Sequence, residues 1–569
     1  MTPPRRDIRA VFMLLLATGL VFGRLAGAEF TTWDDPHTLR DNPDMRPPTL
    51  AGLSDYWRVT TDEQLARGQA VNHRASLWVP LTYSAWLAVA TFAQVPSPTG
   101  GTELNPYLFH IANIAVHALS GIIVYFMLLR LFESRAGAMF GAMLFLLHPL
   151  QVEPVAWASG LKDLLAGALS LAAILLYLTQ AAADRALRRR RLAWWCSLAL
   201  LGMAMLAKPS AVAVPVLLVV IDLLVLRRGM ITAATSAAPF FALTLPIILI
   251  ARIAQTGADV PPVAWLLRPV VALDAMSFYL GKLIWPANLC IDYGRTPAMI
   301  VQSSQINWTW IAPVLLIAAC LFQAFSRRKT NQPSLPAASL TIPLAAVLVF
   351  LLAPLPVLGF VPFTFQNYST TADHYVYLAM LGPAMLIAHW FRSPPPMLAR
   401  GAAIAAIGTL AVTSFAQTKV WMNSRALFEH TVAVNPSSGP GLHNLGALAA
   451  ERNDLDTAAG LFRRALPTQP NASLTYRNLR QVLTARTRTA EAQEVAQAEY
   501  RYRSRGLIAR TGHVWLDPNH AILRAIARGQ EREAIELAEK RLRSNGRDID
   551  TLSLAMLAEQ IERTKSYQQ

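Results

Sequence analysis

The segment Arg5–Asp35, RRDIRAVFMLLLATGLVFGRLAGAEFTTWDD, decides the fold of this chain. A basic flank precedes an apolar stretch from Ala10 to Leu25 that can cross a bilayer. Because basic flanks stay on the cytoplasmic side, we expect the N-terminus inside and Trp33-Asp34-Asp35 just outside the membrane. The stretch is too long for a signal peptide and lacks a convincing cleavage site, so we interpret it as a retained span.

Asp34 and Asp35 form a pair of adjacent carboxylates at this outer boundary. Such a pair in a membrane protein suggests a general base that acts beside a lipid-borne substrate. The alternative is structural: Asp34 would cap a short interfacial helix, and Asp35 would merely face water. Position alone leaves both interpretations open.

The composition is that of an integral membrane protein with a soluble part. Of 569 residues, 54% are hydrophobic and 15% are charged. The net charge of +16 is concentrated in clusters between apolar runs. We therefore attribute it to the positive-inside signal and to anionic lipid headgroups, and we expect no nucleic-acid partner. Cys196, Cys290 and Cys320 form no CxxC motif, so no disulfide or metal framework is predicted.

Assigning each basic cluster to the cytoplasm predicts an all-α, polytopic membrane bundle over residues 1–420. About eleven spans result: 10–27, 107–129, 136–152, 158–181, 192–207, 211–226, 236–253, 308–326, 338–358, 375–391 and 399–418. The odd number puts residues 421–569 on the outer, periplasmic face, together with loops 28–105, 254–307 and 359–374. Two apolar stretches, 77–92 and 263–285, would reverse the charge pattern if either crossed alone. We expect them to be interfacial or re-entrant.

A 34-residue period follows the last predicted span. Its best unit matches the tetratricopeptide pattern, in which small residues let two helices approach and an aromatic ring fills the gap between them: Leu442, Leu445, Gly446, Ala449, Ala458, Phe462, Ala465 and Pro470. Degenerate copies follow near 476–496 and 515–546. Residues 421–569 are therefore predicted to form a soluble α-solenoid whose groove takes an extended peptide or a partner protein. The alternative is a cap that only stabilises the membrane part.

Several polar residues gather at the predicted outer membrane edge. His110, Asn113 and His117 share one helix face, which should point to a cavity or a partner helix. Since the two histidines are two turns apart, we favour helix–helix hydrogen bonding over a metal site. The others at this edge are His148, Glu153, Lys162, Asp163, Lys208, Asp373, His374 and Tyr375. A lysine here could neutralise a phosphate, and a local ion pair is the alternative.

Ordered motifs carry a resemblance to a known family. They are TWDD at 32–35 with NP at 42–43, WVPLT at 78–82, HIAN at 110–113, HPLQVEPVAW at 148–157, KD at 162–163, AKP at 207–209, WPANL at 285–289 and DHYVYL at 373–378. In this order, and with repeats after the last span, the chain resembles the bacterial branch of the transmembrane and tetratricopeptide-repeat proteins. That family is placed in the GT-C glycosyltransferase superfamily, and its animal members are protein O-mannosyltransferases.

The resemblance implies sugar transfer from a polyprenyl-phosphate donor to a hydroxyl acceptor, with protein Ser/Thr expected, at the outer face of the inner membrane. Asp34 or Asp35 would be the base, with Asp35 slightly favoured, and Glu153, Lys162 and Asp163 would lie near it. Lys162, with Lys208 or His374, would stabilise the leaving phosphate, and a single displacement would invert the anomeric carbon. No cofactor is required, and a divalent metal is left open. Related bacterial sequences usually have arginine at position 374, so His374 leaves this position without a permanent cation.

Two other functions compete with the enzyme. One is a non-catalytic scaffold whose repeats recruit a periplasmic partner, and the other is a transporter of lipid-linked sugar. An enzyme needs the Asp34-Asp35 pair and Lys162 at one cavity, whereas a transporter more often has repeats among its spans or charges at mid-membrane. The ionisable groups gather at the outer edge, which favours the enzyme. No P-loop, dinucleotide fingerprint or nucleophile elbow supports cytosolic nucleotide chemistry.

Overall fold

A computed structural model of the chain describes residues 5–59, 77–98, 100–180, 187–254, 263–303, 306–329, 341–393, 396–468, 472–499 and 531–545. The chain divides into two compact units, Met1–Asn444 and Leu445–Gln569. By this division the first unit extends beyond residue 420, so the helix that follows the last predicted span belongs to the membrane unit.

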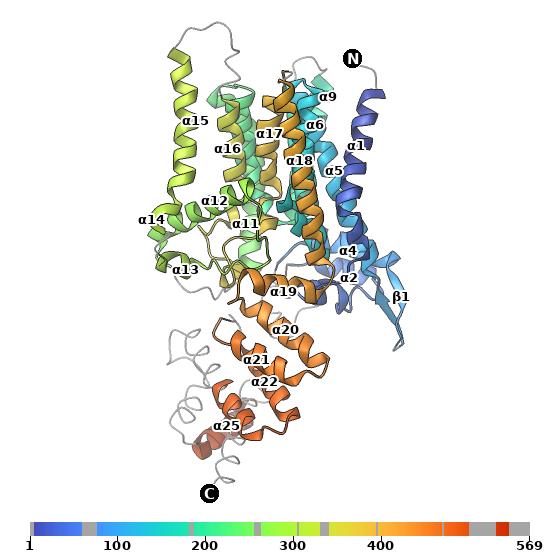
Figure 1. The fold of residues 1–569 in the computed structure, drawn as a ribbon, viewed down its shortest axis with the longest axis vertical. Helices are drawn as coiled ribbons and strands as arrows, with labels where there is room; N and C mark the ends of the chain where they lie inside the picture. Colours follow the sequence, from blue (N-terminus) through green and yellow to red (C-terminus); the bar gives the residue numbers. More distant parts are fainter. Residues whose placement is uncertain are drawn as a thin grey trace. The chain divides into compact units, whose positions relative to one another are not determined.

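The first unit is a bundle of apolar helices (Figure 1). They are α1 (Arg5–Phe22), α5 (Pro106–Phe132), α6 (Arg135–Leu147), α8 (Leu161–Gln180), α9 (Leu187–Ala207), α10 (Val214–Val220), α11 (Met230–Ala254), α15 (Ile311–Lys329), α16 (Ile342–Leu352), α17 (Leu381–Trp390) and α18 (Met397–Gln417). One of these helices lies in each of the eleven predicted spans. Among the described residues, five helices are long and apolar enough to cross a membrane, or six if the bent pair Arg135–Leu147 and Pro149–Ala156 is one span. The count of eleven stays a prediction.

Small residues bring α6 and α17 into backbone contact. A Cβ added at Gly137 would lie 2.4 Å from the Ala388 carbonyl oxygen, and one at Gly141 would lie 2.5 Å from that of Ala384. Glycines four residues apart on one helix therefore face alanines four residues apart on the other. This spacing of small residues is typical of helix pairs in lipid, where association depends on close van der Waals packing.

Shorter elements gather at the end of the bundle where α1 finishes (Figure 1). They are α2 (Leu50–Tyr56), α4 (Pro80–Phe92), α12 (Arg268–Ile284), α13 (Pro297–Gln302), α14 (Ile306–Thr309) and α19 (Ser424–Val434). The stretches predicted as interfacial, 77–92 and 263–285, contain α4 and α12, and neither is among the helices long enough to cross. In Figure 1, α12 runs across the direction of the bundle, and Trp285 at its end is 76% exposed.

The all-α prediction is wrong in one detail, because this end also carries a small hairpin. Strand β1 (Gln94–Pro96) pairs antiparallel with β2 (Thr102–Leu104), with Gln94 opposite Leu104. Gly100 and Gly101 both have positive φ in the connection. Two consecutive glycines accept this conformation without steric strain, which allows the tight reversal.

The second unit contains the repeat helices. Helix α20 (Gly439–Glu451) crosses the boundary between the units, and α21 (Leu455–Ala465), α22 (Ser473–Ala485) and α25 (Glu531–Asn545) follow. A Cβ at Gly446 would meet the Phe462 ring at 2.8 Å, and Phe462 is buried with Ala458 and Leu479. This contact has the small-residue and aromatic pairing of a tetratricopeptide unit. The solenoid stays a prediction, because Pro470 and much of the copy near 515–546 lie outside the described residues.

Candidate active site

Asp35 is fully buried and holds the loop that follows α1 against the turn before α8. Its Oδ2 accepts hydrogen bonds from the Thr31 amide (2.8 Å) and hydroxyl (3.0 Å). Its Oδ1 accepts from the Ser159 amide (3.0 Å) and hydroxyl (2.5 Å). Burial raises the pKa of Asp35, and the four donors oppose that shift by stabilising the carboxylate. Asp35 does not face water, so that part of the structural alternative is wrong.

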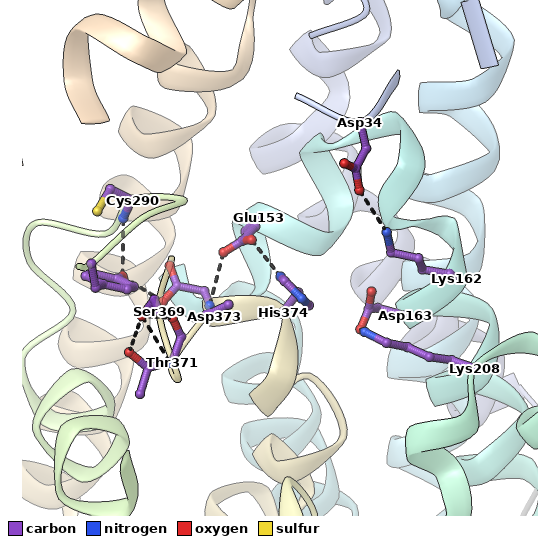
Figure 2. A network of polar contacts seen from close by, with 12 residues as sticks. Asp34, Glu153, Lys162, Asp163, Lys208, Cys290, Ser369, Thr371, Asp373 and His374 are labelled. Atoms are coloured by element: carbon purple, nitrogen blue, oxygen red, sulfur yellow. Dashed lines mark hydrogen bonds and ion pairs between the residues drawn. The ribbon is translucent and has the colours of Figure 1, made fainter. Parts of the chain in front are cut away.

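Asp34, the neighbouring carboxylate, is open to its surroundings. Its side chain is 45% exposed, and Oδ2 lies 3.5 Å from the Nζ of Lys162 (Figure 2). The same ammonium lies 4.1 Å from the centre of the Trp157 ring, in cation–π geometry. The two adjacent aspartates therefore differ in environment: one is enclosed by donors, and the other is exposed beside a single lysine.

Glu153 joins the short helix α7 (Val152–Ala156) to the turn Asp373–Val376. Its Oε2 accepts from the Asp373 amide at 3.1 Å, and its Oε1 lies 2.7 Å from Nδ1 of His374 (Figure 2). The Asp373 carboxylate accepts from the Tyr293 hydroxyl at 2.8 Å. Burial raises the pKa of Asp373 well above its usual value, and it lowers that of His374 to about 3. His374 is therefore neutral at physiological pH.

Lys208 forms an ion pair with Asp163 of α8. Lys208 lies between α9 and the short helix Pro209–Ala213, and its Nζ is 5.3 Å from the centre of the Tyr375 ring. Burial lowers the pKa of Lys208, while Asp163 opposes that shift. The pair thus keeps two charges together at a largely enclosed position.

A pocket of ≈ 440 Å³, which includes space open to the surroundings, brings several of these groups together. Its polar wall contains Asp163, Lys208, His374 and Tyr375. The rest of the lining is mostly small or apolar: Ala166, Gly167, Ser170, Ser210, Ala211, Ala353, Pro354, Val357, Tyr377 and Leu378. A second recess, too narrow to hold a water molecule, is lined by Glu153, Asp373, Gln417 and mostly apolar residues. The His374–Glu153 contact therefore joins the lining of the pocket to that of the recess.

Two members of the predicted polar face on α5 cross-link the fold. The Asn113 amide donates to the backbone carbonyls of Val155 (3.3 Å) and Trp157 (2.7 Å). His117 lies 3.0 Å from the Leu146 carbonyl oxygen through Nε2. These contacts fit the interpretation as helix–helix hydrogen bonds. Asn113 in particular holds the turn that carries Ser159.

The remaining residue of that face, His110, and the predicted site residue His148 after α6 are also buried within the fold. His148 Nε2 lies 3.0 Å from the Leu283 carbonyl oxygen, and its Nδ1 accepts from the Leu150 amide. These bonds attach the end of α6 to α12. His110 is buried in α5. None of His110, Asn113, His117 and His148 lines the pocket or the recess.

Sequence reasoning missed Ser159 and Ser170. Ser159 donates twice to Asp35, and Ser170 lines the larger pocket. No sequence signal marks either residue, since an isolated serine is ordinary both in a turn and in a membrane helix. Within the described part of the chain, no group of three or more His, Cys, Asp or Glu residues is placed to hold a metal ion.

No model of a known protein family matches the chain. Human protein O-mannosyl-transferase TMTC1 is 33% identical over 183 residues, which cover 31% of this chain and 19% of that protein. Human protein O-mannosyl-transferase TMTC3 is 22% identical over 509 residues, which cover 81% of this chain and 52% of that protein. The chain thus spans about half the length of TMTC3 and a smaller part of TMTC1.

Among solved structures, ArnT from Cupriavidus metallidurans bound to undecaprenyl phosphate aligns with a TM-score of 0.36 and 16% identity, over 87% of this chain and 80% of that one. At that score the alignment does not establish a shared fold. The sequence matches carry the relationship, and they confirm the resemblance that the ordered motifs predicted. This chain is a homologue of the protein O-mannosyl-transferases TMTC1 and TMTC3.

Proposed function

We propose that this chain is a GT-C-type membrane glycosyltransferase that moves a sugar from a polyprenyl-phosphate donor to a protein Ser/Thr hydroxyl at the periplasmic face. Homology to protein O-mannosyl-transferases supports the reaction class. The observation that carries the proposal is the half-exposed Asp34, in the loop that follows α1, beside Lys162 in the first turn of α8. A proton acceptor and a cation for a leaving phosphate are thereby side by side.

Asp34 is the better candidate for the base, which revises the sequence-based preference for Asp35, because Asp35 is fully buried. A general base must reach the proton that it removes, within hydrogen-bond distance or through one water. Both oxygens of Asp35 are already engaged by Thr31 and Ser159. In this proposal Asp35 is a positioning residue: it fixes the backbone from which Asp34 projects toward Lys162.

The reaction is a single displacement. Asp34 takes the proton of the acceptor hydroxyl while that oxygen bonds to the anomeric carbon, and the bond from this carbon to the phosphate oxygen breaks. The phosphate gains one negative charge as Asp34 loses one. Lys162, no longer opposed by a carboxylate, is then available to the phosphate. One displacement inverts the anomeric configuration.

The surroundings suit a lipid-linked donor. The larger pocket has a polar wall at Asp163, Lys208 and His374, and apolar residues such as Val357 and Leu378 on its other sides. This mixture fits a molecule that combines a polar headgroup with a hydrocarbon chain. The repeat unit would bind the protein acceptor, as tetratricopeptide grooves bind extended peptides.

A transfer assay tests the proposal. The full-length protein in lipid nanodiscs would receive polyprenyl phosphate carrying radiolabelled mannose, together with a periplasmic protein extract. We expect label on protein with wild type, and a loss of at least about 100-fold with Asp34→Asn, as for removal of a general base. Asp41→Asn is the matched control, because Asp41 is an exposed carboxylate of the same loop that pairs with Arg40.

Transfer by folded Asp34→Asn at the wild-type rate would remove Asp34 as the base. Absence of transfer by wild type from mannosyl, glucosyl and galactosyl donors alike would contradict the enzyme. Specific capture of a periplasmic protein by the inactive full-length chain would then favour the scaffold.

A further inference from the structure

Two buried polar atoms at the larger pocket have no partner. Asp163 Oδ2 and Ser170 Oγ make no hydrogen bond among the described residues, although Asp163 is 7% exposed and Ser170 only 1%. A buried polar atom without a partner costs about 1 to 3 kcal/mol. Buried groups of this kind are rare in folded proteins, and a bound ligand is one way of satisfying them.

The two atoms belong to one face of one helix. Asp163, Gly167 and Ser170 follow each other at spacings of four and three on α8, so they align along the pocket. A Cβ at Gly167 would lie 2.5 Å from the Tyr377 ring. Glycine at this position therefore lets the ring pack directly against the helix backbone, between the two polar residues, and form part of the pocket wall.

His374 adds a third group to the same pocket. Its Nδ1 faces the Glu153 carboxyl group, and its Nε2 is left to accept or donate a hydrogen bond, according to the tautomer. No hydrogen bond of Nε2 occurs among the residues that the structure describes. In Figure 2 the His374 ring lies between Glu153 and the Asp163–Lys208 pair, and His374 lines the pocket together with Asp163 and Lys208. The contact with Glu153 thus fixes the orientation of the imidazole ring at the pocket wall.

These groups match hydroxyls better than they match phosphate. Asp163 Oδ2 can only accept, whereas His374 Nε2 and a serine hydroxyl can donate or accept. Hydroxyl groups can satisfy all three, whereas a phosphate oxygen would be repelled by the carboxylate. The ammonium of Lys208 is already paired with Asp163. The phosphate would therefore contact Lys162, outside this lining.

We propose that the larger pocket holds the sugar ring of the donor, with Asp163 Oδ2, Ser170 Oγ and His374 Nε2 bound to its hydroxyls. This assignment rests on the proposed function and adds a specificity-determining residue, Ser170, to it. Because Ser170 lies two turns along α8 from Asp163, the two contact different hydroxyls of one ring.

The first test measures lipid binding to the full-length protein in nanodiscs. The probes are polyprenyl phosphate alone and polyprenyl phosphate carrying mannose, glucose or galactose. We expect wild type to prefer at least one sugar-bearing lipid. Ser170→Ala should weaken the binding of that lipid about three- to tenfold, which is the effect of one neutral hydrogen bond. It should leave the binding of the sugar-free lipid unchanged. The matched control is Thr18→Val, because Thr18 is equally buried and bonds its own helix at Leu14.

An equal loss for both kinds of lipid, or no loss for either, would overturn the sugar subsite. So would equal binding of sugar-bearing and sugar-free lipid by wild type. The transfer assay with Asp34→Asn decides the proposed function independently of these results, since it does not involve Ser170.

A second test identifies the hydroxyl that Ser170 contacts. Donors that each lack one sugar hydroxyl would be bound to wild type and to Ser170→Ala. For one deoxy donor, wild type and Ser170→Ala should bind with equal affinity, because the hydroxyl that Ser170 contacts is already missing. This is the result expected for a coupled pair in a double-mutant cycle. The same difference for every deoxy donor would contradict the contact.

Discussion

Asp34 and Asp35 are adjacent in the chain, but only Asp35 accepts hydrogen bonds that hold the fold together. Asparagine at position 35 would place an amide NH₂ against donors from Thr31 or Ser159 and leave them unsatisfied. We predict that Asp35→Asn lowers the free energy of unfolding by about 2 kcal/mol or more. Asp34→Asn loses only a half-exposed ion pair and should change the free energy of unfolding by less than about 1 kcal/mol. Thermal unfolding in detergent compares them, and equal stability of the two variants would contradict the positioning role.

A second prediction at the scale of the residue concerns pH. Burial lowers the pKa of His374 to about 3, below an unfolded value near 6.5. The unfolded state therefore binds the proton first, so this part of the stability is present above pH 6.5 and is lost as pH falls toward 3. His374→Gln should flatten the dependence of the unfolding temperature on pH in that window. The control is His37→Gln, at an exposed residue of the loop that follows α1, and an unchanged slope in His374→Gln would contradict the prediction.

The sequence predicts that these polar residues lie near one another better than it predicts which of them are in contact. Glu153, Lys162, Asp163, Lys208 and His374 were all expected near one another, because the charge pattern places them at the same membrane edge. Which of them touch could not be predicted, since Glu153 and His374 are separated by 221 positions in the chain. Periodicity also cannot separate Asp34 from Asp35, because adjacent residues share the same local pattern. Whether the site acts as proposed stays a prediction.

At the scale of the element, the contact between α6 and α17 depends on glycine. We predict that Gly141→Ala lowers the free energy of unfolding by about 1 to 3 kcal/mol, because the added methyl would meet the Ala384 carbonyl. Gly19→Ala in α1 is the matched control, since nothing lies within 4 Å of a Cβ there. Thermal unfolding in detergent measures both variants. Equal stability of the two would contradict the prediction, because it would show that α6 and α17 accommodate the added methyl group without a loss of stability.

The hairpin shows what element prediction missed. Gly100-Gly101 follows Pro96, Ser97 and Pro98, a cluster typical of a turn, so a signal was present in the sequence. The strands are only three residues each, too short for alternation to be detected. Long apolar runs predicted the helices, but a pattern of this kind cannot be detected in strands of three residues.

At the scale of the whole molecule, the predicted sidedness can be tested with single cysteines. In a background without Cys196, Cys290 and Cys320, Asp41→Cys and Ser437→Cys should react with a membrane-impermeant maleimide in intact spheroplasts. Arg189→Cys, in the basic cluster between two predicted spans, should react only after permeabilisation. Labelling of Ser437→Cys only after permeabilisation would contradict the odd number of spans. Asp41→Cys reports the first outer loop independently of that count.

Paired charge at the site has a consequence for how a donor arrives. Asp34 faces Lys162, and Asp163 faces Lys208. Burial raises the pKa of Glu153 to about 8, so at neutral pH Glu153 and the neutral His374 add little charge. Electrostatic steering requires a net potential that reaches into solution, and opposite charges this close largely cancel at a distance. The site therefore does little to attract a dissolved anion. A lipid-linked donor would reach it by lateral diffusion, so its capture rate should follow the surface density of donor in the bilayer and respond weakly to ionic strength.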